Sequence, residues 1–125
     1  MNNRYRAEIL RWIDGDTIQL RVDLGQKVLI RGKFRLARVD APETALRRGV
    51  TKEEKTAGLS LKDRLRAAYP PTTEVLVSTT KQGKYGRYIV EVYTSTPFDS
   101  SLPTSIDGYY NLSDSLLALG LAEEY

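Results

Sequence analysis

The chain has 125 residues, a length that suits one compact domain with a real core but not two independent ones. Lys and Arg number 19 against 16 Asp and Glu, and the resulting formal charge of +3 and pI near 9.2 are compatible with an anionic partner without requiring one. Because histidine and cysteine are absent, Ser-His-Asp triads, imidazole acid–base chemistry, thiolate nucleophiles and disulfides are excluded, and any catalysis must use carboxylates, cations, tyrosines or a bound metal.

The N-terminal region, residues 5–23, is predicted to form an antiparallel hairpin. Apolar and polar residues alternate on both sides of Asp14-Gly15, and this period of two is typical of half-buried strands. Asp-Gly is a favoured pair in tight hairpin turns, so the chain is expected to reverse there.

A long third strand is predicted over residues 27–39. In it Phe34 and Leu36 face one way and Arg35 faces the other. Arg38 breaks this pattern because it shares the parity of the two apolar residues. Its side chain needs an anion or an opening if that face is buried.

A helix is predicted after the third strand. Thr51 and Glu54 form a T-x-x-E capping box at its start, and Pro70-Pro71 ends it. Its predicted core stripe consists of Ala57, Leu61, Leu65 and Ala68.

Two further strands are predicted around residues 75–77 and 89–93, where β-branched and aromatic residues accumulate. Residues 94–108 are rich in Ser, Thr, Pro, Asp and Gly. Such a segment is too short to link two domains, and we expect a long surface loop.

A short second helix is predicted over residues 112–119, with Asn111 or Ser113 near its start and Gly120 at its C-terminal cap. Three strands, a helix, two strands and a helix fit an α+β chain that is mainly β. We expect a five-stranded OB-fold Greek-key barrel capped by two or three helices, in a single domain over residues 1–125.

The start of the chain lacks the apolar core of a secretory signal, and no apolar run approaches the ~20 residues of a membrane span. We therefore expect no membrane association and a cytoplasmic location. A secreted mature form from which a signal peptide had been removed would give the same sequence.

Two aspartates are candidates for a metal site. Asp16 follows the predicted tight turn and Asp40 ends the third strand, so both carboxylates can converge with a backbone carbonyl such as that of Ala41. Hard oxygen ligands of this kind suit calcium or magnesium. Taken separately, each motif also fits plain turn chemistry or an ordinary strand exit.

Arg35 and Arg87 are candidates for clamping phosphate oxygens, which a guanidinium can do in a bidentate manner. They fit salt bridges to the nearby carboxylates equally well. Glu43 is placed to activate or orient a water molecule, or to serve as a surface glutamate. Lys84 and Tyr85 suit a nucleotide contact or an exposed turn.

Three motifs together resemble the staphylococcal nuclease (thermonuclease) family. They are IDGDT at residues 13–17, FRLARVDAPE at residues 34–43 and KYGRY at residues 84–88, in this order and with a predicted helix between the second and the third. The resemblance spans about residues 5–122. It implies an OB-fold barrel with helices, and a calcium-dependent nuclease, a metal-dependent phosphodiesterase that cleaves DNA and RNA at the P–O5' bond and leaves 3'-phosphates.

The same resemblance implies roles for individual residues. One Ca²⁺ ion is expected to bind to Asp16, Asp40 and the main-chain carbonyl of Ala41. The phosphate-binding, transition-state-stabilising arginines are expected to be Arg35 and Arg87, and the carboxylate that activates or orients the attacking water is expected to be Glu43. Asp14 corresponds to a carboxylate behind the metal ligands, and Lys84 and Tyr85 to groups that contact the nucleotide's phosphate.

The chain also departs from the family pattern. Residues 94–108 are longer than the tight hairpin usual at this place. Family members often continue past Tyr125 into a tyrosine-bearing segment and a third helix, so we expect a reduced aromatic platform, with Tyr125 as a candidate substitute. A monomer without an obligate protein partner is expected. The main alternative to an active enzyme is a module of the same fold that only holds nucleic acid or methylated peptides, and an assembly subunit is a further alternative.

Overall fold

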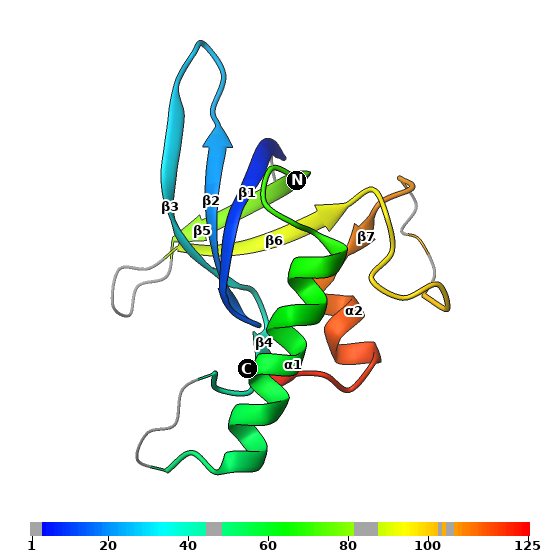
Figure 1. Cartoon of the computed structure of the whole chain (residues 1–125). Helices are drawn as coiled ribbons and strands as arrows, with labels where there is room; N and C mark the ends of the chain where they lie inside the picture. Colours follow the sequence, from blue (N-terminus) through cyan, green and yellow to red (C-terminus); the bar gives the residue numbers. More distant parts are fainter. Residues whose placement is uncertain (1–3, 45–48, 82–87, 103, 105–106) are drawn as a thin grey trace.

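The computed structural model describes residues 4–44, 49–81, 88–102, 104 and 107–125. It shows a mainly β chain in which a closed five-stranded barrel is accompanied by two helices (Figure 1). In chain order the elements are β1 (Tyr5–Asp14), β2 (Thr17–Asp23), β3 (Leu29–Leu36), β4 (Val39–Asp40), α1 (Lys52–Ala68), β5 (Glu74–Lys81), β6 (Tyr88–Thr94), β7 (Tyr110–Asn111), α2 (Leu112–Ala118) and β8 (Glu123–Glu124).

The barrel consists of β3, β2, β1, β5 and β6 in this spatial order. Successive strands in this order are antiparallel, and the barrel closes where β3 pairs in parallel with β6 through Phe34–Leu36 and Tyr88–Val90. Strand β1 pairs with β2 on one edge and with β5, the strand that follows α1, on the other. The predicted OB-fold barrel is therefore confirmed.

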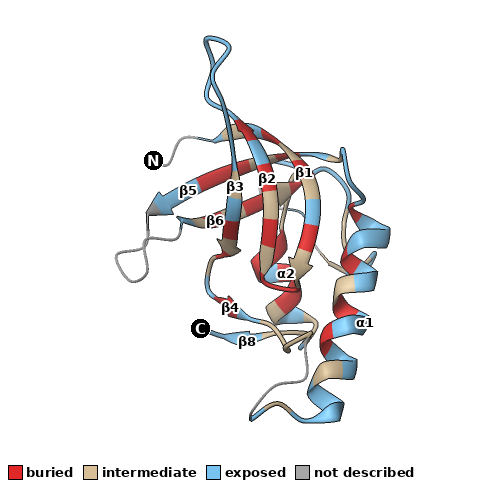
Figure 2. Ribbon diagram, turned by 60° about the vertical axis from the view of Figure 1, so that its left-hand side comes forward, coloured by how far each residue is buried: buried red, intermediate tan, exposed pale blue. Residues whose placement is uncertain are grey.

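Alternating side chains of the strands fill the barrel. Figure 2 shows β1, β2 and β3 side by side, with buried and exposed residues alternating along them. This alternation is the pattern from which the strands were predicted. The buried apolar residues are Ala7, Ile9, Trp12, Ile18, Leu20, Val22, Phe34, Leu36, Val39, Leu61, Leu65, Tyr69, Val75, Val77, Val90, Val92, Leu112 and Leu116.

A bulge in β1 changes which residues face the core. Ile9 lies opposite Leu20 in β2, but the next pair is Arg11 with Gln19, so Leu10 is an extra residue. The extra residue reverses the alternation after it. Arg11 is therefore exposed, and Trp12 is buried.

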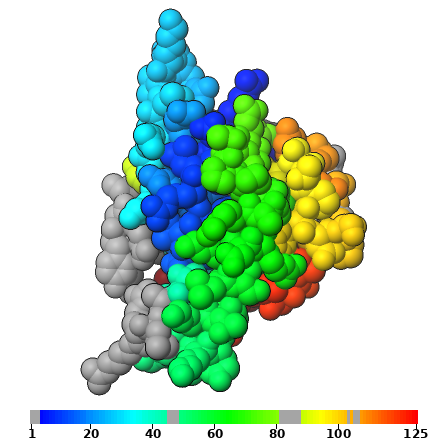
Figure 3. Space-filling view, in the orientation of Figure 1, coloured from blue at the N-terminus to red at the C-terminus, as the bar shows by residue number. Residues whose placement is uncertain are grey.

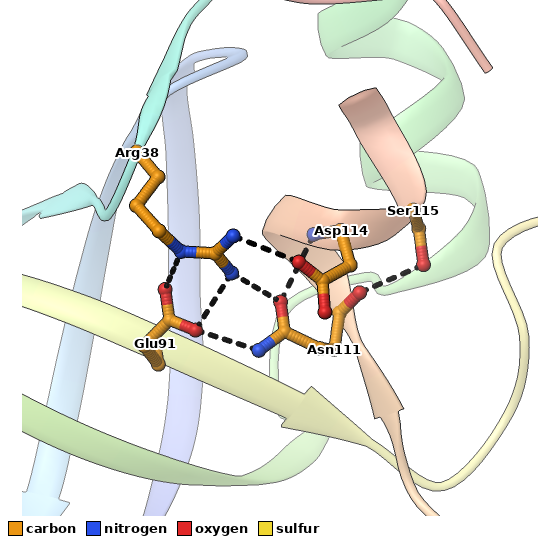
Figure 4. A network of polar contacts seen from close by, with 5 residues as sticks. All are labelled: Arg38, Glu91, Asn111, Asp114 and Ser115. Atoms are coloured by element: carbon orange, nitrogen blue, oxygen red, sulfur yellow. Dashed lines mark hydrogen bonds and ion pairs between the residues drawn. The ribbon is translucent and has the colours of Figure 1, made fainter. Parts of the chain in front are cut away.

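The predicted third strand is not continuous, and in this respect the prediction was wrong. Strand β3 ends at Leu36, and Arg38 adopts a left-handed backbone conformation with φ of 66° before β4 begins. The Arg38 guanidinium leaves the sheet and forms ion pairs with Glu91 (3.0 Å) and Asp114 (2.8 Å), beside Asn111 (Figure 4). Arg38 has thus found an anion, and the hydrogen bond to Glu91 raises the pKa of its guanidinium further.

The capping box of α1 is borne out at its N-cap. The Thr51 side chain accepts a hydrogen bond from the backbone N–H of Glu54 at 3.1 Å, and the helix ends at Ala68, before the two prolines. The predicted stripe is only half correct. Leu61 and Leu65 are buried, but Ala57 and Ala68 are exposed. The remaining buried positions are Gly58 and Tyr69.

Tyr69 fastens the end of α1 to the barrel. Its carbonyl accepts a hydrogen bond from Trp12 Nε1 at 3.1 Å, and its hydroxyl lies 3.2 Å from the Thr94 hydroxyl and donates to the Thr96 carbonyl at 2.8 Å. Burial of the ring raises the pKa of the Tyr69 hydroxyl. The helix is thereby tied to both β1 and the end of β6.

Helix α2 begins where the sequence predicted. Asn111 is its N-cap and accepts a hydrogen bond from Asp114 N at 3.0 Å, and Gly120, with φ of 68°, follows the C-cap residue. The described part of residues 95–109 contains no helix or strand, in agreement with the predicted loop. Across the described residues, neither helix has the length and apolar character needed to cross a bilayer.

Candidate nuclease site

The candidate site forms where the β1–β2 turn meets the ends of β3 and β4. Thr17 lies directly opposite Arg35 in the β2–β3 register, and this pairing places the turn against the end of β3. A cavity of about 250 Å³ lies between them. It is lined by Asp14, Asp16, Thr17, Arg35, Asp40, Ala41, Pro42 and Glu43.

Asp16 is buried and firmly oriented. Its Oδ1 accepts a hydrogen bond from the Thr17 hydroxyl at 3.0 Å, and its Oδ2 accepts one from the backbone N–H of Ala41 at 2.9 Å. Its carbonyl accepts a further bond from Leu36 N at 2.8 Å. The turn is therefore joined directly to the segment that follows β4.

Arg35 lies between the two candidate metal ligands. Its Nη1 is 3.4 Å from Asp16 Oδ2, and its Nη2 is 3.3 Å from Asp40 Oδ1 and donates to the Val39 carbonyl at 3.2 Å. These ion-pair distances exceed the 2.7–2.9 Å typical of tight charge-assisted bonds. The salt-bridge alternative thus describes Arg35 in part, but the pairing is loose.

The third guanidinium nitrogen of Arg35, Nε, makes no hydrogen bond to any described residue. Nε is buried and has no hydrogen-bond acceptor among the described residues. The whole side chain is only 11% exposed. A buried donor without a partner costs about 1–3 kcal/mol. An acceptor that reached Nε would remove that cost.

Glu43 lines the same cavity from a segment that packs against α1. Gly58 of α1 touches this segment so closely that a Cβ atom there would lie 2.7 Å from the Pro42 carbonyl oxygen, and closer still to that of Glu43. Sequence reasoning missed Gly58. The available signal was an isolated glycine inside an otherwise regular helix.

Asp14 also lines the cavity, and its Oδ1 accepts a hydrogen bond from the Thr44 hydroxyl. This bond links the start of the β1–β2 turn to the residue after Glu43. Thr44 was not singled out from the sequence, and no local pattern marks it.

The C-terminal residues form one side of the site. Strand β8 pairs with β4, so that Asp40 lies opposite Glu123, and Tyr125 N donates to the Arg38 carbonyl at 3.1 Å. The exposed Tyr125 ring lies over the Arg35 guanidinium, 4.2 Å from its Cζ atom to the ring centroid. Tyr125 therefore contacts an arginine, whereas the sequence suggested only a platform for a base.

Three of the predicted site residues cannot be placed. Lys84, Tyr85 and Arg87 lie outside the described residues. The other predicted residues, Asp14, Asp16, Arg35, Asp40, Ala41 and Glu43, all line the one cavity.

A family comparison bears on this arrangement. The model of the family described as staphylococcal nuclease homologue matches residues 33–125, about three-quarters of the chain. The chain belongs to this family. A search of curated proteins finds no match. As a staphylococcal nuclease homologue, the chain is a nuclease-like or nucleic-acid-binding module.

The matched region of this staphylococcal nuclease homologue contains part of the site. It includes Arg35, Asp40, Ala41 and Glu43, whereas Asp16 lies before it. The contribution of the β1–β2 turn therefore rests on the structure, in which the carboxylate of Asp16 is bonded to the backbone of Ala41.

The donor set of the cavity fits a hard cation. Among the described lining residues, four carboxylates face one guanidinium, so a bound cation would offset an excess of negative charge. No group of three or more acidic side chains in the described part of the chain is close enough to hold an ion alone. An ion held by Asp16 and Asp40 would need carbonyl and water oxygens as its other ligands, and Ca²⁺ accepts such mixed shells of six to eight oxygens.

Proposed function

We propose that this protein is a calcium-dependent nuclease that hydrolyses phosphodiester bonds of DNA and RNA at the P–O5' bond and leaves 3'-phosphates. The observation that carries the proposal is the position of Arg35, between Asp16 and Asp40 in a cavity that Glu43 also lines. The candidate metal ligands, the arginine that would bind phosphate and the candidate general base therefore lie next to one another.

Arg35 would bind the scissile phosphate. Its Nε–H lacks an acceptor among the described residues, and its two Nη groups are held only loosely by carboxylates. A phosphate oxygen could accept from the Nη groups without breaking a tight ion pair. Because the guanidinium is largely desolvated, its stabilisation of charge that develops on phosphorus would be stronger than at an exposed position.

Glu43 would orient or deprotonate the attacking water. The carboxylate reaches the cavity from a segment held by the contact of Gly58 with the Pro42 and Glu43 carbonyls. A base on such a segment stays at a fixed distance from the phosphate, which general base catalysis requires.

Asp16, Asp40 and the carbonyl of Ala41 would hold the calcium ion. When bound, the ion would supply positive charge to the phosphate and lower the pKa of a coordinated water. Asp14 would not bind the ion directly. Its hydrogen bond with Thr44 would keep the β1–β2 turn against the segment that carries Glu43. Arg87, Lys84 and Tyr85 stay predictions, as a second phosphate-binding cation and as nucleotide contacts.

The test is digestion of plasmid, single-stranded DNA and RNA in Ca²⁺, in Mg²⁺ and in EDTA, followed by analysis of the product ends. We expect cleavage in Ca²⁺, none in EDTA, and 3'-phosphate ends. Glu43→Gln should lower kcat by about 10²- to 10⁴-fold, the usual contribution of a general base.

Glu74→Gln is the matched control, because Glu74 is an exposed carboxylate on β5 that does not line this cavity. It should retain full activity. Binding of the three nucleic acids without any cleavage in Ca²⁺ would reject the enzyme and support the binding module.

A further inference from the structure

The outer face of the barrel carries further cations beside Arg35. Side chains on β3 alternate between the two faces, so Arg31 and Lys33 lie on the same face as Arg35, away from Phe34 and Leu36. Successive residues on one face of a strand are about 6.7 Å apart. The three cations therefore form a line that starts at the cavity and runs toward the tip of the β2–β3 hairpin. In Figure 3 this hairpin projects from the rest of the molecule.

The bulge in β1 adds a cation from a second strand, Arg11, to this face. Arg11 lies opposite Gln19, and Gln19 lies opposite Lys33, so the three side chains share one row across the sheet. Without the extra residue Leu10, Arg11 would face the core. Bulges often re-aim a side chain next to a functional site.

Apart from Arg35, these cations have no counter-ions among the described residues. We use the name cation row for three residues of this face, Arg11 on β1 and Arg31 and Lys33 on β3. All three side chains are exposed, and none of them forms an ion pair with a described residue. Arg31 lies directly opposite Arg21, and only Arg21 is neutralised, by Glu8 at 2.6 Å.

Like charges placed opposite one another destabilise a sheet. An external polyanion on this face would remove the repulsion. Because Glu8 neutralises only Arg21, the positive charge of Arg31 is left available to such a polyanion.

We infer that the cation row binds backbone phosphates of a polynucleotide strand that extends from the cavity along β3. The inference rests on the proposed function in one respect, because it takes the cavity as the position of the scissile phosphate. Arg31 lies four residues from Arg35, or about 13 Å along the strand. The rise of a stacked strand, about 3.4 Å per nucleotide, is a lower limit for an extended strand, so this span corresponds to at most about four nucleotides. The preferred substrate is thus an extended strand and not a dinucleotide.

The experiment measures binding of oligodeoxythymidylates of 2 to 12 nucleotides in Ca²⁺, with all proteins carrying Glu43→Gln to suppress cleavage. One protein has an otherwise native sequence, and one also carries Arg11→Gln, Arg31→Gln and Lys33→Gln. In the first, affinity should rise as the length increases from 2 to about four nucleotides. In the second, the rise should be lost while dinucleotide binding persists.

Salt dependence gives an independent readout. Each phosphate contact on a single strand contributes about 0.7 to the slope of log K against log salt, so the triple change should reduce the slope by about 2. The affinities of the two proteins for the 12-mer should converge near 1 M salt and differ about 100-fold at 0.1 M.

The matched control carries Lys62→Gln, Arg64→Gln and Arg66→Gln on α1, which remove the same charge elsewhere. Its slope and length dependence should stay close to those of the native sequence. Equal behaviour of the two triple variants would overturn the inference, as would equal binding of the 2-mer and the 12-mer by the native sequence.

The two proposals fail in different ways. If the protein with Glu43 intact cleaves nothing in Ca²⁺ but shows length-dependent binding that the triple change removes, the enzyme is rejected and the cation row stands. The thermal midpoint of the row variant should not fall, because its side chains are exposed and one like-charge pair has been removed.

Discussion

Arg35 is held between two carboxylates, yet it keeps one buried N–H group without an acceptor among the described residues. An arginine that served only to neutralise Asp16 and Asp40 would be expected to direct all its donors to them, at shorter distances. The loose pairing instead leaves room for an anionic ligand. At the scale of single residues, the site is defined by this arginine and by the close contact of Gly58 with the Glu43 segment.

The contact at Gly58 leads to a prediction. Gly58→Ala should raise intrinsic helix propensity by about 1 kcal/mol, but the new Cβ must push the backbone of residues 42–43 away. We therefore expect the free energy of unfolding to fall by about 1–3 kcal/mol, the usual cost of overpacking, and the proposed nuclease activity to fall at least tenfold. Urea unfolding and digestion of single-stranded DNA measure the two effects.

Ser60→Ala, at an exposed position of the same helix, is the control for helix propensity. It should lower neither the free energy of unfolding nor the activity. A Gly58→Ala protein that is as active and as stable as the native one would show that α1 does not position Glu43.

At the scale of secondary structure elements, a few side chains join the elements around the site. Tyr69 ties the end of α1 to β1 and to the end of β6. Arg38 ties the turn between β3 and β4 to β6 and α2. Because β4 supplies Asp40, these links also limit how far the site can move.

Tyr69 should make the free energy of unfolding decrease at alkaline pH. Burial raises the pKa of its hydroxyl above the ordinary value of 10.0, so above that pH the unfolded chain releases a proton that the folded protein retains. The contribution is fully present below pH 10 and is lost as the pH rises through the folded pKa. Urea midpoints measured from pH 8 to 11 should therefore fall at the alkaline end.

Tyr69→Phe should lower stability at pH 7 by about 1 kcal/mol for each lost hydrogen bond and should reduce the alkaline decline. An unchanged slope between pH 9 and 11 in the variant would contradict this assignment.

At the scale of the whole molecule, the barrel leaves several acidic side chains around one cavity, where four described carboxylates meet one arginine. A cation that binds there binds only the folded state, because the ligands come from residues far apart in the sequence. Cation binding should therefore stabilise the entire domain by linkage.

We predict that Ca²⁺ at 100 times its dissociation constant raises the free energy of unfolding by about 2.7 kcal/mol relative to EDTA. Asp40→Asn should abolish most of this increase, whereas Asp63→Asn, on the exposed face of α1, should leave it intact. Thermal unfolding with increasing Ca²⁺ measures the effect. A native protein whose midpoint does not respond to millimolar Ca²⁺ would exclude this cation site.

Much of the fold was readable from local patterns. Alternation predicted the strands of the barrel, and the T-x-x-E box and the two prolines predicted the limits of α1. The break at Arg38 was missed because a left-handed residue other than glycine leaves little trace in the sequence. The bulge at Leu10 and the two-residue strand β8 were missed because neither contains enough residues to show a period.

The sequence by itself determined the barrel, its helices and the family, because these depend on periodicities and motifs within short stretches of chain. It also named six residues that line the candidate cavity, while their roles and the positions of Lys84, Tyr85 and Arg87 stay predictions. Only the tertiary structure decided that Arg35 lies between Asp16 and Asp40, that Gly58 holds the Glu43 segment, and that Arg11 joins Arg31 and Lys33 on one face. The reason is physical: strand register and close backbone contact depend on residues that are distant in the chain, and no local pattern encodes them.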